Sequence, residues 1–461
     1  MTWREYVPDS SAALSSAYDQ LRSLIPDSIP PRFRQKGTDF SRDRRLPFRE
    51  LITFILSSAV SDRDSGLDIK IGEFVKQARR SGIWPDAQTF HPSAVSKARA
   101  KLPWQAFEAI LADAVDCAYL HINERSSRRW HGMSVFGIDG SKFSLPATEE
   151  IRREFDPDSG LDNPGKGHYP QCLVSTAYDV FERIPVARCI AAYATSERDE
   201  AKLLLPHIPG GGVTLFDRGY PSYEFLLTLL AQYHGFFVLR CPAESTFPAV
   251  EKFVRGGKAE ALLNIHPSQT YLHGLRAEQR RLARPVQVRA IRMVSPDGVL
   301  SVLLTSMIDV RKFPRRDIID LYFERYRIEE YYRHEKVTID IETFHSRSPN
   351  GIRQELFAAA IVSTIAGTLI GLTGESQPTS RVGPQFKNAV FALAREAVVL
   401  TPQDPQAALS IFKELIRQVA RVKYYRRAGK RPPQPRICKK PPNKWCLVRG
   451  KTLAEIKGAS K

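Results

Sequence analysis

The sequence predicts an α/β protein in which a mixed sheet is flanked by helices. Two observations lead to this fold class. Three apolar stretches with strand character follow one another between residues 133 and 193, with short polar links between them. Helical and strand patterns then alternate from residue 196 to residue 242. A meander followed by alternating α and β units builds a sheet with antiparallel and parallel pairs, and helices cover its faces.

The region before the sheet is expected to be helical. Residues 91–121 indicate two helices that are broken near Pro103. The first of them presents Lys97 and Arg99, so it is either a recognition helix that lies on DNA or an ordinary surface helix. We therefore expect a helical N-terminal DNA-binding domain over residues 1–128.

The three consecutive strands are expected within residues 133–146, 169–180 and 184–193. The first of them, "MSVFGIDGSKFSLP", ends in turn residues. A helix is expected next, in "SERDEAKLLLPHI", where Ser196 and Asp199 have the spacing of a capping box.

Alternating elements follow this helix. "GGGVTLFDRGY" (210–220) predicts a strand bounded by glycines, "SYEFLLTLLAQYHG" a helix that Gly235 ends, and "FFVLRCP" (236–242) a further strand. Residues 243–312 interrupt the alternation with two strand-like runs joined by "SPDG", which predicts a β-hairpin. We expect a β-rich insertion there.

The stretch "LFAAAIVSTIAGTLIGLTG", residues 356–374, has nineteen residues without a charge. Its length is near the minimum for a membrane span, but a helix buried in a large soluble core has the same composition. Because the chain holds one such stretch, the core helix is the favoured interpretation and no membrane partner is expected. The six cysteines form no CxxC pair, and the N-terminus shows no signal core, which favours the cytoplasm.

The charge distribution points to a polyanionic partner. The net charge is +18, and residues 421–451 contain twelve Lys or Arg and no Asp or Glu. This basic segment also holds aromatic residues, among them Tyr424 and Trp445. Phosphates attract the cations and bases stack on the rings, so nucleic acid is the expected partner, although a solvated tail that aids solubility has the same composition. We expect residues 373–461 to form a C-terminal helical region with this basic tail.

One helix, "LYFERYRIEEYYRHEK" (321–336), aligns four polar side chains. Tyr322, Arg325, Glu329 and Lys336 have the spacing Y-x2-R-x3-E-x6-K. At about 100° per residue they fall within an arc of about 60°, which is a single face over four turns. The alternative is a solvent-facing stripe held by an i,i+4 ion pair.

Two acids occur where strands are predicted to run or end. Asp139 follows "VFGI" and Asp217 follows "VTLF". Acids in apolar strands are unfavourable unless they are paired or bind a metal. Taken singly, Asp139 fits a turn before Gly140 and Asp217 fits a strand-end cap. Together with Glu329 they are typical of an oxygen-rich site for two Mg²⁺ or Mn²⁺ ions that act on a phosphodiester.

These residues resemble a known family. "FGIDGS", "FDRGY" and the four-residue helix spacing are similar to the DDE transposases of bacterial insertion sequences, in the branch with the Y-R-E-K signature, the IS-four family. The resemblance covers about residues 130–372 well. It implies a ribonuclease-H-like core over residues 129–372 with the insertion at about 243–312, inside the 112 residues (329 − 217) between the second Asp and the Glu.

The resemblance also implies roles for individual residues. Asp139, Asp217 and Glu329 would be the catalytic acids and metal ligands. The side chains expected to contact DNA are those of Tyr322, Arg325, Lys336, Arg218, Lys97 and Arg99.

The expected activity is that of a DNA transposase. Such an enzyme cleaves double-stranded DNA at the terminal inverted repeats of its element and joins the 3′-hydroxyl ends to target DNA. A homodimer in a synaptic complex, located in the bacterial cytoplasm and associated with the nucleoid, is implied as well. Two alternatives stay open: a metal-dependent nuclease that does not join ends, and a catalytically inactive DNA-binding protein derived from such an element.

Overall fold

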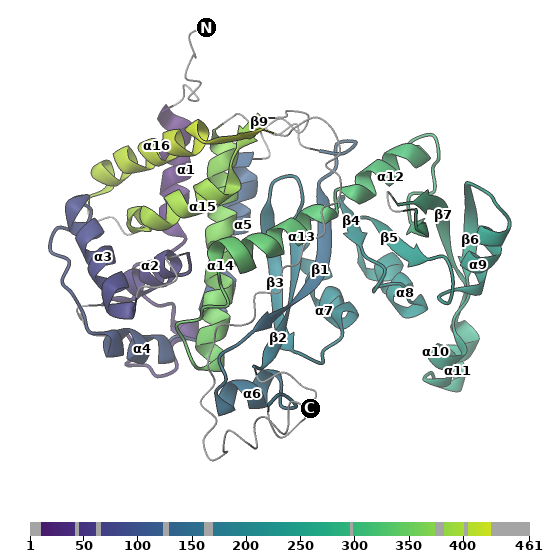
Figure 1. The fold of residues 1–461 in the computed structure, drawn as a ribbon, viewed down its shortest axis with the longest axis horizontal. Coiled ribbons are helices and arrows are strands. Elements are labelled where there is room, and N and C mark those ends of the chain that lie inside the picture. The colour runs from purple at the N-terminus through teal and green to yellow at the C-terminus, as the bar shows by residue number, and fades with distance from the viewer. Residues whose placement is uncertain are drawn as a thin grey trace, which may run out of the picture.

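The core of the protein is an eight-stranded sheet in the order β3-β2-β1-β4-β5-β8-β7-β6. Its strands are β1 (Val135–Ser144), β2 (Gln171–Asp179), β3 (Ile184–Ala192), β4 (Val213–Phe216), β5 (Phe236–Pro242), β6 (Glu260–Ile265), β7 (Val286–Val294) and β8 (Leu300–Thr305). The computed structural model describes residues 11–41, 46–60, 66–122, 129–160, 169–295, 298–373, 382–400 and 404–425. In Figure 1 the sheet runs from the centre of the molecule to its right-hand side.

The first five strands form the predicted mixed core. β1 pairs with β2 and β2 with β3 in antiparallel fashion, whereas β1, β4 and β5 run parallel to one another. Helices α7 (Glu197–Leu204) and α8 (Tyr223–Gln232) connect β3 to β4 and β4 to β5. The strand order 3-2-1-4-5 with an antiparallel second strand is the ribonuclease-H-like arrangement. The predicted fold class is therefore confirmed.

The β-rich insertion extends this same sheet. β8 pairs with β5, β7 with β8 and β6 with β7, all antiparallel. The predicted hairpin is present, because Val294 at the end of β7 pairs with Leu300 at the start of β8. Helices α9 (Pro248–Arg255), α10 (Gln269–His273) and α11 (Ala277–Leu282) belong to the insertion, at the right of Figure 1.

Helices from both ends of the chain pack together at the left of Figure 1. Helix α14 packs against α5, α15 and β3. The helices of this layer are α1 (Ser11–Ser23), α2 (Phe48–Ser58), α3 (Leu67–Arg80), α4 (Pro92–Ala100), α5 (Gln105–Ile122), α14 (Pro349–Leu372), α15 (Phe386–Arg395) and α16 (Pro405–Arg421). The predicted break near Pro103 separates α4 from α5. The three-part domain division stays a prediction.

Shorter elements complete the described chain. They are η1 (Pro31–Phe33), α6 (Glu149–Phe155), η2 (Leu205–His207), η4 (Ala397–Leu400) and the two paired strands β9 (Val382–Pro384) and β10 (Lys423–Tyr425).

Helix α14 contains most of the apolar stretch considered as a membrane span. It is the one helix in the described part of the chain that is long and apolar enough to cross a membrane, and 94% of its apolar window is buried. Its residues from 354 to 370 are all buried among the other helices and the sheet. This burial favours the core-helix interpretation.

The helix predicted over residues 321–336 is less regular than expected. It begins earlier and divides into α12 (Arg315–Phe323), α13 (Tyr326–Arg333) and a π-helix η3 (His334–Ile339). At the joint, the Arg325 N–H donates to the Tyr322 carbonyl at 3.1 Å, and the Ile328 N–H donates to the Arg325 carbonyl at 3.1 Å. These i→i+3 bonds tighten the backbone where α12 passes into α13.

Buried polar contacts attach this helix to the sheet. The Arg188 guanidinium of β3 donates to the Glu335 carboxylate at 2.7 Å, and both side chains are fully buried. Arg188 also donates to the Tyr331 hydroxyl at 2.7 Å and to the Leu356 carbonyl of α14 at 2.8 Å. One side chain therefore ties together β3, η3, α13 and α14.

Candidate active site

The candidate site lies where β1 runs past the end of β4. The two strands pair as far as Gly137, which lies opposite Leu215. β4 then ends at Phe216, whereas β1 continues. Extending the parallel register brings Asp139 level with Asp217, two residues beyond the last pair. The edge of β1 is thus open at Asp139, and the loop after β4 carries Asp217 beside it.

Asp139 lies inside a strand rather than in a turn. It is opposite Thr176 of β2, so the alternative of an Asp-Gly turn does not hold. Its carbonyl accepts a hydrogen bond from the Tyr332 hydroxyl of α13 at 2.8 Å. The contact fixes the backbone of Asp139 against the helix that carries Glu329.

Helices α12 and α13 bring three more residues to this edge. The Tyr322 hydroxyl lies 3.5 Å from an Asp217 carboxylate oxygen. The Arg325 guanidinium donates to Glu329 at 2.6 Å and approaches an Asp139 carboxylate oxygen at 3.9 Å. The i,i+4 ion pair of the alternative interpretation exists, but the stripe does not face solvent, because Tyr322 and Arg325 are 4% and 8% exposed.

The fourth member of the stripe, Lys336, lies further along β1. Its ammonium donates to the Ser141 hydroxyl at 2.8 Å and to the Lys142 carbonyl at 2.5 Å. It also lies 4.5 Å above the Phe143 ring. Burial lowers the pKa of Lys336 from its ordinary value. Lys336 belongs to the π-helix, so the turn that places it on β1 differs from the regular helix expected.

The electrostatics of the site disfavour the charged form of Asp139. Burial raises the pKa of its carboxyl to about 7, Arg325 opposes this shift, and Glu197 and Asp217 add to it. Burial also raises the pKa of the Tyr322 hydroxyl well above its ordinary value. A buried acid surrounded by other acids is stabilised in its charged form by a nearby cation.

The donor set suits a divalent metal ion by its chemistry. Carboxylate oxygens are the ligands that Mg²⁺ and Mn²⁺ prefer, and the desolvated Asp139 carboxylate between other acids is the kind of group that a cation stabilises. Within the described ranges, no three His, Cys, Asp or Glu side chains converge closely enough to hold a metal ion. The positive charge beside Asp139 and Glu329 is supplied by Arg325.

The three remaining predicted DNA contacts differ in their surroundings. Arg218 follows Asp217 and is exposed, and Lys97 is exposed on α4. Arg99 has an internal role instead, because it donates to Gln354 at 3.0 Å and to Glu355 at 2.8 Å on α14. These contacts attach α4 to α14, and the expectation that Arg99 binds DNA stays a prediction.

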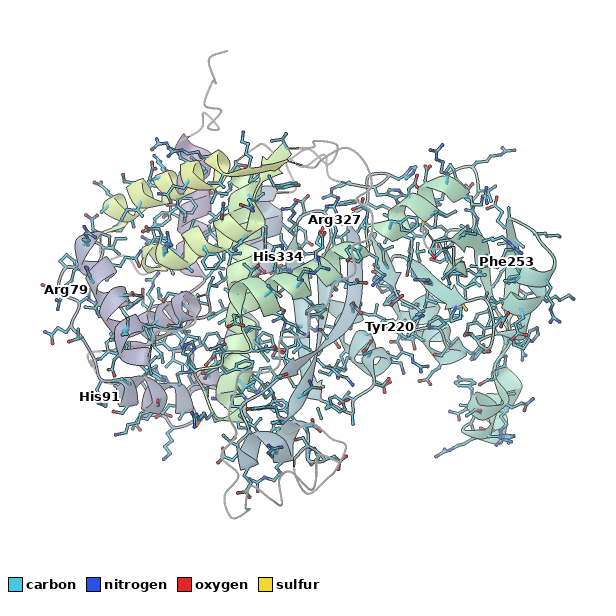
Figure 2. All side chains as sticks on the ribbon, viewed as in Figure 1. Arg79, His91, Tyr220, Phe253, Arg327 and His334 are labelled. Atoms are coloured by element: carbon cyan, nitrogen blue, oxygen red, sulfur yellow. The ribbon has the colours of Figure 1, made fainter. Side chains whose placement is uncertain are left out.

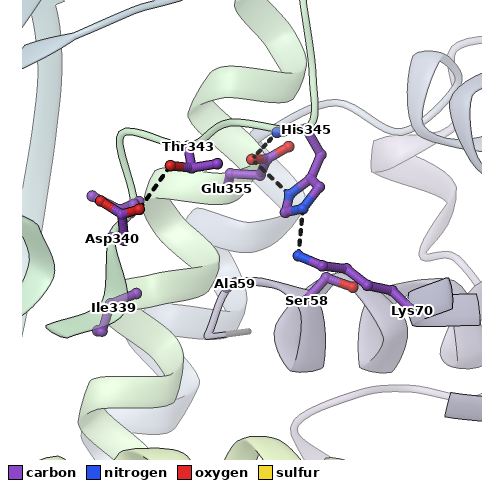
Figure 3. Close-up of a pocket in the computed structure, with 9 residues that line it drawn as sticks. Ser58, Ala59, Lys70, Ile339, Asp340, Thr343, His345 and Glu355 are labelled. Carbon is purple, nitrogen blue, oxygen red and sulfur yellow. Dashed lines mark hydrogen bonds and ion pairs between the residues drawn. The ribbon is translucent and has the colours of Figure 1, made fainter. Parts of the chain in front are cut away.

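Glu355 links Arg99 to a second internal cluster, shown in Figure 3. The Lys70 ammonium of α3 lies 2.6 Å from the His345 ring, whose other nitrogen lies 3.6 Å from the Glu355 carboxylate. Together with Ile339 and Asp340 at the end of η3, these residues line a cavity of about 20 Å³. The contacts join the helical layer to the segment that follows α12, α13 and η3, which together are called the signature helix (residues 315–339).

Two further polar residues at the site were not identified from the sequence. Glu197 begins α7, where the sequence predicts a capping box, but the Ser196 side chain makes no capping hydrogen bond. Tyr220, labelled in Figure 2, lies on the loop between β4 and α8. The "DRGY" stretch contained a signal for Tyr220, whereas nothing local connects Glu197 with Asp139.

The fold and this acidic edge define the class of protein, a ribonuclease-H-like enzyme that acts on nucleic acid. Residues 130–365, just over half of the chain, match the family described as transposase DDE domain. The chain therefore belongs to this family, in the IS-four group of DDE transposases, and it is a DNA transposase. The family generally uses divalent metal ions.

Curated relatives agree with this assignment. The chain is 27% identical to the transposase InsG of insertion sequence element IS4 from Escherichia coli K12, over 76% of this chain and 77% of the relative. It is 32% identical to the putative transposase InsZ of the same organism, over 22% and 33% of the two chains. It is also 27% identical to the putative transposase y4zB of Sinorhizobium fredii, over 38% and 47%.

Proposed function

We propose that Asp139, Asp217 and Glu329 are the catalytic acids and metal ligands of this transposase, with two Mg²⁺ or Mn²⁺ ions as cofactors. The observation that carries the proposal is the convergence of three elements on one sheet edge. β1 supplies Asp139, the loop after β4 supplies Asp217, and α13 supplies Glu329, which Arg325 links to Asp139. When bound, such ions activate an attacking water or 3′-hydroxyl and stabilise the leaving oxygen.

The cationic residues of the stripe would bind the phosphates next to the scissile bond. The Arg325 guanidinium is a planar fork suited to a phosphate, and it lies between Asp139 and Glu329. Lys336 presents a compact charge two residues beyond Asp139 along β1. Tyr322 would donate a hydrogen bond from its place beside Asp217.

The proposed substrates are the terminal inverted repeats of the element and a target duplex. We propose a homodimer that pairs two ends in a synaptic complex, in the bacterial cytoplasm and associated with the nucleoid. Exposed Arg218 and Lys97 are further candidate contacts. The basic segment adds sequence-independent attraction to phosphates, and apart from residues 421–425 it lies outside the described residues.

Cleavage of the element's own ends tests the proposal. Purified protein is mixed with DNA that carries the terminal repeats and with a target plasmid. We expect cleaved and joined products in Mg²⁺ or Mn²⁺ and none in EDTA. Asp139→Asn and Asp217→Asn are expected to bind the ends without cleaving them, because the amide keeps the shape and loses the charge. Cleavage by Asp217→Asn at the wild-type rate contradicts the assignment, and cleavage without joining identifies a nuclease.

A further inference from the structure

Lys142 lies on the face of β1 opposite the proposed catalytic acid Asp139. A Cβ atom placed on Gly137 would lie 3.5 Å from a side chain of α13, whereas one placed on Gly140 would lie 2.9 Å from a side chain of α7. Alternate residues of a strand point to the same face, so Asp139 shares the α13 face with Gly137, and Lys142 shares the α7 face with Gly140. Lys142 is exposed. The face opposite Asp139 therefore carries a solvent-accessible cation.

An aromatic ring holds the Lys142 side chain in place. The ammonium lies 3.6 Å from the centroid of the Tyr193 ring. Tyr193 directly follows β3, and its N–H donates to the Phe155 carbonyl at 2.7 Å, so the ring stands on a fixed backbone. Glu197 lies on the same face and attracts the ammonium, but the two groups form no ion pair in the described chain. The cation–π contact positions the ammonium and leaves its charge for an anion.

Lys336 occupies the other face at the same point of the strand. Its ammonium donates to the Lys142 carbonyl at 2.5 Å and to the Ser141 hydroxyl at 2.8 Å. The two lysine side chains therefore lie on opposite faces of one short segment of β1. In the described chain, β1 has no strand partner on the β4 side beyond Gly137, so this segment is part of the open edge. A polyanion that crosses this edge meets a cation on each face.

The joining reaction brings two DNA segments to one site. In an in-line displacement the attacking and leaving oxygens lie on opposite sides of the phosphorus atom. The end that supplies the 3′-hydroxyl and the target phosphodiester therefore approach the acids from different directions. The cations proposed to bind the end, Arg325 and Lys336, lie on the α13 face. Lys142 supplies positive charge on the face that remains for the second segment.

We propose that Lys142 binds a backbone phosphate of the target duplex, on the face of β1 opposite the transposon end. Tyr193 is its positioning residue, because its ring fixes the ammonium beside the open edge. The inference rests on the proposed strand-transfer function and adds a contact with the second DNA substrate. Phosphates of the target and of the end have the same chemistry, so the test measures the binding of the two duplexes separately.

The test uses the full chain saturated with pre-cleaved end DNA in EDTA, so that binding is measured without chemistry. A fluorescent duplex of unrelated sequence serves as the target and is titrated by anisotropy. Lys142→Ala is expected to bind this second duplex about fivefold more weakly at roughly 0.15 M salt, with a log–log salt slope that is smaller by about 0.9, because one phosphate contact is lost. The affinity for end DNA is measured in parallel by gel shift. An equal loss for both duplexes assigns Lys142 to the end and overturns the proposal.

Further variants separate the charge from the ring. Lys142→Arg keeps the positive charge and stacks on an aromatic face, so it should retain most of the affinity for the second duplex. Tyr193→Leu removes the ring and should weaken this binding, whereas Tyr193→Phe restores the ring and should rescue it. Equal losses in both Tyr193 variants overturn the positioning role. Lys202→Ala is the matched control on α7, because its ammonium is already paired with the Asp199 and Glu224 carboxylates, and it should bind the second duplex like the wild type.

Equal affinities of wild type and Lys142→Ala for the second duplex, or no second duplex bound by the wild type, overturn the inference. If Lys142→Ala does not fold, Lys142→Gln decides, because it keeps most of the side-chain length and loses the charge. The titration requires no cleavage. A chain that binds the second duplex through Lys142 but never cleaves or joins element ends therefore supports this inference and contradicts the proposed function.

Discussion

At the residue scale, Arg325 connects the acids of the site. Its guanidinium donates a hydrogen bond to the Glu329 carboxylate and lies 3.9 Å from an Asp139 carboxylate oxygen, and the residue is 8% exposed. One of its two terminal nitrogens, Nη1, makes no hydrogen bond to any described residue. A buried guanidinium between two carboxylates stabilises their charged forms. Its N–H groups that make no hydrogen bond to described residues suit a phosphate oxygen.

Replacing Arg325 by Ala should impair the binding of cleaved ends. The loss of a charged hydrogen bond costs about 1.5–3 kcal/mol, so we expect the complex with end DNA to be about 10- to 100-fold weaker in a gel-shift titration. Arg325→Lys should recover little, because an ammonium lacks the planar fork. Arg316→Ala, at an exposed position on α12, is the control. Wild-type affinity of Arg325→Ala for end DNA contradicts the phosphate-binding role.

Glu355 gives the stability of the protein a defined pH dependence. Burial raises the pKa of its carboxyl, but Arg99 and the hydrogen bonds from His345 outweigh burial and hold it at about 2. A lowered pKa means that the folded state holds the charged carboxylate better than the unfolded state does. The stabilisation is therefore complete above the unfolded pKa near 4.5 and disappears as the pH falls towards 2.

Glu355→Gln should thus lower the free energy of unfolding by about 3 kcal/mol at pH 7. The difference in the free energy of unfolding between wild type and variant, measured by urea denaturation, should shrink by about half between pH 5 and pH 3. Glu414→Gln, in an exposed pair with Arg417, should show neither effect. A difference that is constant from pH 7 to pH 3 shows that the variant disrupts packing alone.

At the scale of elements, the position of the signature helix depends on one buried ion pair. Arg188 of β3 and Glu335 of η3 are both fully buried, so removing one partner leaves the other charge unpaired. Through Tyr331 and the Leu356 carbonyl the same guanidinium also holds α13 and α14. The geometry of Glu329 relative to Asp139 is therefore set by contacts outside the site.

Arg188→Met should lower the free energy of unfolding by about 3–5 kcal/mol, because an uncompensated carboxylate stays in the core. The double variant Arg188→Met/Glu335→Leu should recover much of this loss. The exposed pair Arg316–Asp320 is a control of the same type, and Arg316→Met should change stability by less than about 1 kcal/mol. Chemical denaturation of wild type, Arg188→Met, Glu335→Leu and the double variant measures the coupling. An Arg188→Met variant as stable as wild type refutes it.

At the scale of the whole molecule, positive charge is concentrated at the C-terminal end. Of the net charge of +18, the twelve cations of residues 421–451 leave +6 for the rest of the chain (18 − 12). The structure indicates where to cut, since Lys423–Tyr425 form β10 and the Tyr424 hydroxyl accepts a hydrogen bond from Arg183 at 2.9 Å.

Removal of residues 426–461 should weaken DNA binding for all sequences alike. Each phosphate contact adds about 0.9 to the slope of log affinity against log salt, so the truncated chain should show a flatter salt dependence. Anisotropy titrations at several salt concentrations, with end DNA and with unrelated DNA, measure both slopes. An unchanged slope shows that the segment serves solubility and contributes no phosphate contacts.

The sequence by itself determined the order of strands and helices, and it located the acids relative to them. Apolar runs bounded by turn residues and glycines indicated all five core strands, and each acid was identified from its position beside an apolar run or on a spaced stripe. These features are local, because side-chain periodicity follows from backbone geometry within a few residues. The hairpin of the insertion is local for the same reason.

The tertiary structure alone decided which of these residues meet. The parallel register of β1 and β4 brings Asp139 level with Asp217, 78 positions away (217 − 139), and the packing of α7 adds Glu197 from the other face. Packing also buried Tyr322 and Arg325. It extended the signature helix at its start, made its last turns a π-helix, and hydrogen-bonded Arg99 to Glu355 of α14. Such outcomes depend on strand pairing and side-chain packing between distant segments, which local periodicity does not encode.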